Sequence, residues 1–287
     1  MRTTPVRLAR RRMIAGALVT GVLLAGASAS GAADLRSRLA QGRPIVCAHR
    51  GWLAPDRPEN SLRTMRQTEA RGRFMLEMDL AVARDGSVVM MHDRTIDRTT
   101  DGTGAVAALD ANALRRVHLR PQDGVPTSEH PPFFPDILAW SRTDPAALLM
   151  LDIKRTPPAV VMDQVRRAGM TGRVLLLTFD RATATTAFAA DPDVLVSVLV
   201  TSPAELAFYR GLAGARRFAA YIPLDQPPAL FAAARAGHDV VVTDLLDRRN
   251  ALAQSHGVAD LHGRGVDIVV TNHPVETARQ LEADPPA

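Results

Sequence analysis

The sequence predicts an α/β fold in which a mainly parallel sheet is covered by helices on both faces. Nine short apolar runs follow one another from residue 45, and segments of roughly 10 to 20 residues with helical spacing separate many of them. The runs are apolar throughout, which is typical of strands buried on both faces. Such a sheet is either doubly wound or closed into a barrel, and a length of 287 residues accommodates either one α/β barrel or two smaller domains.

The predicted strands are residues 45–48, 74–80, 88–91, 148–153, 174–179, 194–200, 218–224, 240–243 and 268–271. The predicted helices include residues 61–71, 159–168, 227–236 and 274–281. A (β/α)₈ barrel has eight strands, so one run must be peripheral, and we expect it among residues 194–224.

Two connections are unusual. Residues 84–87 are too few for a crossover helix between the second and third runs. A barrel must therefore be irregular there, or these two strands are not simple parallel neighbours. The Pro-rich stretch 121–135 predicts a surface loop over one end of the sheet.

Residues 1–33 are typical of an export signal. Three arginines at positions 10–12 precede an apolar stretch over residues 13–27, and small residues continue to Ala33. The arginine pair ahead of Met13 and Ile14 resembles a twin-arginine signal. We therefore expect Tat-type export with cleavage, a single folded domain over residues 34–287, and no membrane span after cleavage. The mature protein would be periplasmic or secreted.

Removing this segment changes the charge of the chain. The full sequence has a formal charge of +5, and residues 1–33 hold five arginines and no acid, so the remainder is neutral. The composition therefore gives no reason to expect nucleic-acid binding. Cys47 is the single cysteine, so no internal disulfide forms, and its apolar neighbours indicate a buried thiol.

Two histidines stand directly after predicted strands. His49 closes the first run and His92 the third. In parallel α/β sheets the carboxyl ends of strands face the ligand crevice, so we expect both imidazoles there. One can take a proton from an attacking hydroxyl while the other protonates a leaving alkoxide, because the ordinary pKa of histidine is about 6.5.

Glu77 and Asp79 lie two residues apart in one predicted strand, so their side chains point to the same face. Two carboxylates facing a core are costly unless a cation or a donor neutralises them. Mg²⁺ or Ca²⁺ would do so, and Asp152 at the end of another run supplies a third oxygen ligand. The alternative is that Arg50 and Arg73 hold these carboxylates.

Three further residues are expected near this site. Lysine and arginine together number 35, and Lys154 is the only lysine, which indicates that this position requires a compact ammonium. Lys154 and Arg50 are expected to bind phosphoryl oxygens and to stabilise the transition state. Glu59 either reaches the site or serves the dipole of the following helix, which Asn60 or Ser61 would cap.

These residues lie in motifs that resemble the glycerophosphodiester phosphodiesterase family. The similar elements are His-Arg-Gly at 49–51, Pro-Glu-Asn-Ser at 58–61, Glu-Met-Asp at 77–79, Arg-Asp-Gly at 84–86, His-Asp at 92–93, Arg-Thr-Thr-Asp-Gly-Thr-Gly at 98–104 and Asp-Ile-Lys at 152–154. The similarity is dense over residues 45–104 and weaker as far as residue 274. The family is related to the sphingomyelinase D and phosphatidylinositol-specific phospholipase C barrels.

The resemblance implies an irregular (β/α)₈ TIM barrel of the phospholipase C-like phosphodiesterase type. It implies metal-dependent hydrolysis of small or lipid-derived glycerophosphodiesters to glycerol 3-phosphate and an alcohol. One divalent cation, Ca²⁺ or Mg²⁺, would be held by Glu77, Asp79 and Asp152. His49 and His92 would form the acid and base pair.

The resemblance also groups Arg50 and Lys154 as phosphate contacts, and we place Glu59 with them as a substrate-binding residue. Two positions depart from the family pattern. Position 152 is usually Glu, and Asp there resembles the sphingomyelinase D branch. The family also tends to carry a Trp on the strand before the last, where this chain has Val-Val-Thr-Asp at 241–244.

Two alternative functions remain open from the sequence. The first is a phospholipase D-like or lyase reaction on a lysophospholipid or choline-type headgroup, in which an internal hydroxyl attacks phosphorus and leaves a cyclic phosphate. It would use the same histidines and the same ion. The second is a catalytically silent barrel that binds phosphorylated ligands, because a fold does not fix a function.

Overall fold

The computed structural model describes Met1 and residues 34–51, 54, 56–246 and 257–283. The chain divides into the units Met1–Ser30 and Gly31–Ala287. The predicted export signal at residues 1–33 lies outside the described residues apart from Met1, so it stays a prediction. In the part of the chain that the structure describes, no helix has both the length and the apolar character needed to cross a membrane.

Within the described ranges, eight parallel strands close into a barrel. In chain order they are β1 (Ile45–Ala48), β2 (Met75–Val82), β4 (Leu148–Arg155), β5 (Val174–Thr178), β6 (Leu195–Leu199), β7 (Ala219–Tyr221), β8 (Val240–Asp244) and β9 (Ile268–Thr271). Each strand pairs with the next, and β1 pairs with both β2 and β9, which closes the ring. The predicted (β/α)₈ barrel is therefore confirmed.

The peripheral strand is β3 (Val88–Met90), which pairs antiparallel with β2 at one edge of the sheet. The expectation that the extra run lies among residues 194–224 is therefore wrong, since β6 and β7 both belong to the barrel. The physical reason is the connection at residues 84–87, which is long enough for a hairpin but not for a crossover helix.

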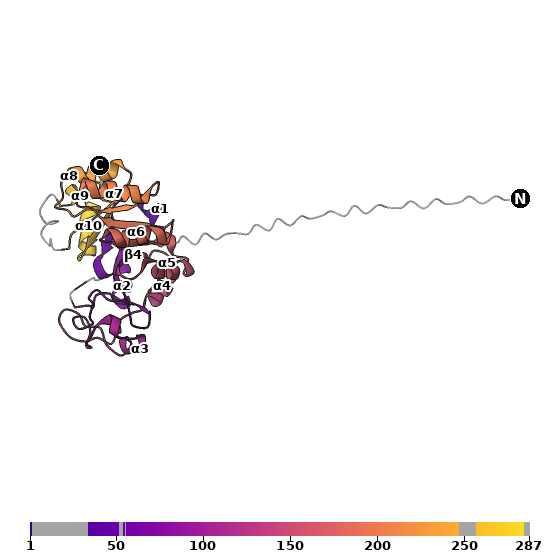
Figure 1. Cartoon of the computed structure of the whole chain (residues 1–287), viewed down its shortest axis with the longest axis vertical. Coiled ribbons are helices and arrows are strands. Elements are labelled where there is room, and N and C mark those ends of the chain that lie inside the picture. Colours follow the sequence, from indigo (N-terminus) through magenta and orange to yellow (C-terminus); the bar gives the residue numbers. More distant parts are fainter. Residues whose placement is uncertain (2–33, 52–53, 55, 247–256, 284–287) are drawn as a thin grey trace. The chain divides into compact units, whose positions relative to one another are not determined.

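Helices follow most of the barrel strands. They are α1 (Leu35–Leu39), α2 (Leu62–Glu69), α3 (Ala111–Leu114), α4 (Phe134–Thr143), α5 (Pro158–Arg167), α6 (Arg181–Ala190), α7 (Pro203–Ala213), α8 (Pro228–Ala236), α9 (Gly257–Arg264) and α10 (Pro274–Ala283), with short 3₁₀ turns η1 (His49–Gly51), η2 (Val106–Ala108) and η3 (Thr171–Arg173). The four predicted helices correspond to α2, α5, α8 and α10. Helices α5 and α6 pack side by side outside the barrel (Figure 1).

Alternation along the strands separates two apolar cores. In β1, Ile45 and Cys47 belong to the cluster inside the barrel, whereas Val46 and Ala48 pack in the layer under the helices. Cys47 has no exposed surface, as its apolar neighbours predict. Each fully buried aliphatic side chain stabilises such a fold by about 1.5–3 kcal/mol. The same period of two decides which polar side chains point into the barrel.

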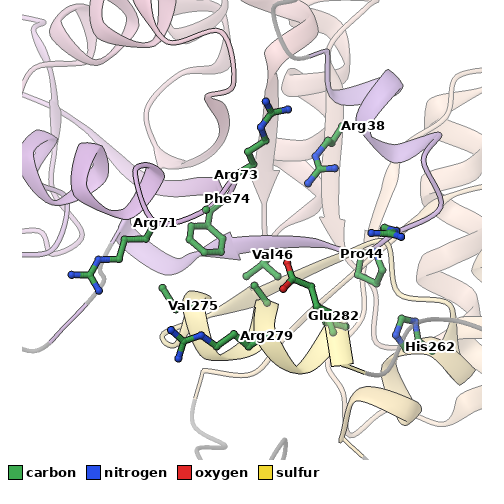
Figure 2. Close-up of a pocket in the computed structure, with 14 residues that line it drawn as sticks. Arg38, Pro44, Val46, Arg71, Arg73, Phe74, His262, Val275, Arg279 and Glu282 are labelled. Carbon is green, nitrogen blue, oxygen red and sulfur yellow. The ribbon is translucent and has the colours of Figure 1, made fainter.

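The amino ends of β1 and β2 border a pocket of about 560 Å³ at the end of the barrel away from the candidate site residues. Figure 2 shows Arg38, Arg71, Arg73 and Arg279 around this pocket. None of the predicted site residues lines it. Arg73 therefore lies away from Glu77 and Asp79, and the alternative that Arg73 neutralises those carboxylates is wrong.

Candidate active site

Three carboxylates meet inside the carboxyl end of the barrel. Met75 and Met150 point into the barrel core, and the residues that follow them on the same faces of β2 and β4 are Glu77, Asp79 and Asp152. Asp79 and Asp152 are register partners across the two strands. One oxygen from each of the three carboxylates lies within 4.8 Å of the others, and the residues are only 2–3% exposed. Along each strand, the inward-facing positions thus change from apolar side chains to carboxylates towards the carboxyl end.

Burial and mutual repulsion oppose full ionisation of this cluster. The pKa of Glu77 is raised well above its usual range, first by burial and then by the charges of Asp79 and Asp152. Burial also raises the pKa of Asp152. Among the described residues, no cationic side chain forms an ion pair with Glu77. Three oxygen ligands with an excess of negative charge fit a hard divalent cation such as Mg²⁺ or Ca²⁺.

Lys154 partly compensates this charge. Its Nζ donates to Asp79 Oδ1 at 2.8 Å and also to Asp152 Oδ2, and its backbone N–H donates to Asp152 Oδ1 at 3.0 Å. Burial favours the neutral amine, yet these two carboxylates raise the pKa of Lys154. Burial would raise the pKa of Asp79 too, but the ammonium of Lys154 leads the charges that lower it. The single lysine thus lies between two members of the cluster.

Replacing Lys154 with Arg is expected to lower kcat/KM by about 10- to 100-fold, the range seen when a group that orients metal ligands is changed. The planar guanidinium is wider than the ammonium and cannot take its place between Asp79 and Asp152 without moving one of them. Steady-state kinetics with saturating metal measures the effect. The exposed Arg167→Lys exchange on α5 is the control and should leave kcat/KM unchanged. Equal kcat/KM of Lys154→Arg and wild type would show that position 154 does not require an ammonium.

A strained turn holds His49 and Arg50 beside the acids. Arg50 and Gly51 have φ of 54° and 59°, in the left-handed region that favours glycine. A Cβ on Gly51 would clash with Cγ of Met65, so glycine also lets the turn pack against α2. In this conformation the backbone N–H of Arg50 donates to Glu77 Oε2 at 2.7 Å. The turn therefore ties the end of β1 to the carboxylate cluster.

The side chain of Asn272, next to the neighbouring strand β9, orients the ring of His49. Its Nδ1 lies 2.9 Å from Oδ1 of Asn272, which directly follows β9. With Nδ1 donating to this oxygen, Nε2 carries the lone pair. Burial and, next, the charge of Arg50 lower the pKa of His49 below its ordinary 6.5. The imidazole is thus neutral at neutral pH and can accept a proton.

Arg50 and Glu59 form an ion pair above the cluster. Nη1 of Arg50 lies 3.0 Å from both carboxylate oxygens of Glu59, and its Nε lies 3.5 Å from Asp79 Oδ2. Of the two arginines considered as partners of the acids, Arg50 therefore does approach Asp79. Asn60 exchanges two hydrogen bonds with Asp79, at 2.9 and 3.0 Å. Asn60 is thus not the cap of α2, and Ser61 takes that position.

His92 is held by a second set of charges. Its Nδ1 lies 2.7 Å from Asp93 Oδ1, and the guanidinium of Arg155 donates to its backbone carbonyl. The guanidinium of Arg98 donates to both carboxylate oxygens of Asp93, at 2.7 and 3.1 Å. It also donates to both carboxylate oxygens of Glu59, at 2.8 and 2.9 Å. Hydrogen bonds from Arg98 hold the pKa of Asp93 far below its usual range. Arg98 therefore links the loop of His92 to the loop of Glu59.

The structure brings the predicted site residues together at one end of the barrel, and it adds three that sequence reasoning missed: Asn60, Arg98 and Asn272. Asn272 stands directly after a predicted strand, which is the same signal that identified His49. Asn60 was considered only as a helix cap. Arg98 lies in a loop whose sequence has no periodicity. Apart from the family motif at 98–104, nothing in the sequence therefore indicates its contacts with Asp93 and Glu59.

The chain matches a known protein family over most of its length. Residues 49–276 match the model of the glycerophosphoryl diester phosphodiesterase family, a range that contains every predicted site residue. The chain belongs to this family. The resemblance seen in the sequence motifs is therefore confirmed.

Curated relatives match over a shorter stretch. Glycerophosphodiester phosphodiesterase 1 of Bos taurus is 45% identical over 76 residues, which cover 26% of this chain and 23% of the bovine protein. The probable glycerophosphodiester phosphodiesterase 1 of Mycobacterium tuberculosis is 40% identical over 76 residues, 26% of this chain and 27% of that protein. The match thus spans about a quarter of these relatives' length.

Solved structures of the family share the fold over most of the chain. A glycerophosphoryl diester phosphodiesterase from Parabacteroides distasonis has a TM-score of 0.76 at 20% identity and covers 88% of this chain and 93% of its own. A phosphodiesterase from Oleispira antarctica, solved in complex with the product sn-glycerol-3-phosphate, has a TM-score of 0.68 at 19% identity and covers 85% and 99%. At these identities the likeness establishes the barrel fold.

Proposed function

We propose that this barrel hydrolyses glycerophosphodiesters to glycerol 3-phosphate and an alcohol with the help of one divalent cation. The observation that carries the proposal is the buried cluster of Glu77, Asp79 and Asp152, in which one oxygen from each carboxylate lies within 4.8 Å of the others. The charge of Asp79 opposes the lowering of the pKa of His49, and the charge of His92 helps to lower the pKa of Asp79. Acid, base and cation ligands thus share one end of the barrel.

His49 is the proposed base. Its Nδ1 is engaged by Asn272, and its lowered pKa keeps Nε2 unprotonated at neutral pH. Nε2 can therefore take the proton of a water molecule whose oxygen forms the new bond to phosphorus. The dipole of the Asn272 side chain fixes the ring orientation and the tautomer.

His92 is the proposed acid. In the acid form of the ring, the carboxylate of Asp93 accepts the hydrogen bond from Nδ1, and Nε2–H points away from Asp93. That proton passes to the alkoxide as its bond to phosphorus breaks. The reaction then leaves a phosphomonoester and a neutral alcohol. His49 has gained the proton of the water, His92 has given one to the alcohol, and proton exchange with solvent restores both rings.

The cation held by Glu77, Asp79 and Asp152 would neutralise phosphoryl oxygens and favour attack on phosphorus. Arg50, Lys154 and Glu59 are the other proposed substrate-binding residues. Arg50 and Lys154 both approach Asp79, so their charges lie next to the place where a phosphate bound at the cluster would gain negative charge. Glu59 holds the guanidinium of Arg50 in place. The phosphodiesterase from Oleispira antarctica, which was solved with its product sn-glycerol-3-phosphate, supports glycerol 3-phosphate as the product.

Removal of the cation tests this proposal. Treatment with chelator is expected to abolish glycerol 3-phosphate release from glycerophosphoglycerol, because three buried carboxylates without a cation repel the phosphate. Addition of Mg²⁺ or Ca²⁺ should restore the rate, and the ion that restores it at lower concentration is the one the site prefers. An enzymatic assay of glycerol 3-phosphate follows the reaction. A rate that is unchanged after exhaustive chelation would contradict metal dependence.

We also propose that the protein is exported to the periplasm or secreted. The support is the sequence of residues 1–33, with its three arginines, apolar stretch and small residues. Cell fractionation of the full chain, compared with a variant whose Arg10–Arg12 are replaced by lysine, tests this proposal. Retention of both proteins in the cytoplasm would contradict it.

A further inference from the structure

A pocket of about 270 Å³ adjoins the candidate site on the side of His92. Its lining includes Arg57, Glu59, Arg98 and Arg120. Arg98 donates to Asp93, and Asp93 in turn accepts from Nδ1 of His92. Two contacts therefore join the wall of this pocket to the ring that, in the proposed function, protonates the leaving alkoxide. In the proposed function the alcohol leaves from the side of this acid, so Arg98 and Asp93 join the pocket to the position of the leaving group.

The pocket is strongly positive. Three guanidiniums line it, and Glu59 is its only carboxylate among the described lining residues. Glu59 is already paired with both Arg50 and Arg98. Burial would raise the pKa of Glu59, but hydrogen bonds from Arg98 and the charge of Arg50 lower it, so the carboxylate is ionised and fully engaged.

Two of the three guanidiniums have no carboxylate partner. Nη2 of Arg120 donates to the backbone carbonyls of Asp97 at 2.6 Å and Arg98 at 3.3 Å, which leaves its charge uncompensated. The side chain of Arg57 makes no hydrogen bond or ion pair with any described residue. Guanidinium groups of this kind bind phosphate oxygens in a two-pronged manner.

We propose that this pocket receives the alcohol moiety of the substrate and selects alcohols that carry a further phosphate. The inference rests on the proposed function, because it names the alcohol of the same reaction. A neutral polyol would be accepted next, through hydrogen bonds to the arginines and to Gln122. A choline or ethanolamine group would be disfavoured, since its positive charge would face Arg57 and Arg120.

The composition of the wall supports this ranking. Proteins recognise quaternary ammonium groups through the faces of aromatic rings. None of the described residues that line this pocket is aromatic; beside the charged groups they are Thr99, Pro121, Gln122 and Gly124. A cationic alcohol thus meets repulsion without a compensating surface among these residues.

Substrate competition tests the inference. We would measure kcat/KM with saturating metal for glycerophosphoinositol 4-phosphate, glycerophosphoinositol and glycerophosphocholine. The first two differ only by the phosphate, so their ratio isolates its contribution. We expect kcat/KM to be highest for glycerophosphoinositol 4-phosphate, lower for glycerophosphoinositol and lowest for glycerophosphocholine. At low salt the first two values should differ by about tenfold. Because the selection is electrostatic, this ratio should fall as the ionic strength rises.

Two variants assign the effect to the pocket. Arg57→Gln removes one uncompensated charge and is expected to lower the ratio of phosphate-bearing to unphosphorylated substrate several-fold. Arg279→Gln removes the same charge from α10, beside the pocket at the amino ends of the strands in Figure 2, and should leave the ratio as in wild type. Thermal melting of both variants checks that they fold.

The outcomes separate the inference from the proposed function. Turnover of all three substrates at equal kcat/KM, or a preference for glycerophosphocholine, would overturn the inference and leave the proposed hydrolysis in place. An equal loss of the ratio in Arg57→Gln and Arg279→Gln would also overturn it, because the effect would then reflect net charge. Failure to hydrolyse any of the three substrates in the presence of metal would contradict the proposed function and the inference together.

Discussion

Replacing His49 or His92 with Ala is expected to lower kcat by about 10²–10⁴-fold while the fold is retained, as for other positioned acid and base groups. Each ring is only partly buried and packs at the rim of the barrel, so its removal opens no cavity in the core. Each also has a dedicated partner, Asn272 for His49 and Asp93 for His92, which fixes the tautomer that the proposed roles require.

The pH dependence separates the two roles. The pKa of His49 is lowered by burial and by Arg50, and the base must be unprotonated to act. The rate should therefore rise with pH through a pKa below 6.5, and His49→Ala should lose this rising limb of the profile. The histidine roles would be refuted by near-wild-type kcat in either alanine variant.

His118→Ala is the matched control for the histidine variants. His118 also forms a histidine–carboxylate pair, with Nδ1 2.9 Å from Asp101 Oδ2, and it lies in the same connection between β3 and β4 as Asp93. It is not among the residues of the proposed site. This variant should keep the wild-type rate, so a comparable loss of activity would show that the loops, rather than the site, limit the reaction.

Replacing Asp79 with Asn is expected to abolish detectable activity together with metal binding. Asp79 is the most heavily engaged of the three acids, because Lys154, Asn60 and Arg50 all approach its oxygens. The exchange removes one of the three proposed carboxylate ligands. It also places an amide N–H₂ against Lys154, Asn60 and Arg50, which are themselves hydrogen-bond donors. We expect the affinity for the cation to fall by at least about 100-fold.

Thermal melting measures this effect independently of turnover. A ligand that binds only the folded state raises Tm, so saturating Mg²⁺ or Ca²⁺ should stabilise wild type. The Asp79→Asn protein should lack this rise, whereas Asp136→Asn on the exposed start of α4 should show it in full. An equal metal-induced rise in Asp79→Asn and wild type would place the cation elsewhere.

The strand pattern allowed much of the site to be predicted. Because side chains alternate along a strand, the spacing of Glu77 and Asp79 places both inside the barrel with Met75, and the structure confirms this arrangement. Strand ends likewise located His49 beside the acids. These predictions depend on local periodicity alone, which a sequence displays directly.

The contacts between residues on neighbouring strands could not be predicted from the sequence. Lys154 was expected to contact phosphate, and the structure shows its ammonium held by Asp79 and Asp152. The contact of Asn272 with His49 joins the last strand to the first, a separation of 223 residues. Such pairings depend on barrel closure, which no local pattern encodes. The peripheral strand is a different case, because the short connection at residues 84–87 is a local signal for the hairpin of β2 and β3.

Product analysis by phosphorus NMR in ¹⁸O-labelled water tests the central claim most directly. The protein would be incubated with glycerophosphoglycerol and with a lysophospholipid, in the presence of Mg²⁺ or Ca²⁺ and in the presence of chelator. We predict metal-dependent glycerol 3-phosphate that carries one labelled oxygen, since the proposed reaction forms a bond from water to phosphorus. A cyclic phosphate as the final product would contradict hydrolysis and favour the lyase reaction, and intact substrates under every condition would favour a barrel that only binds phosphorylated ligands.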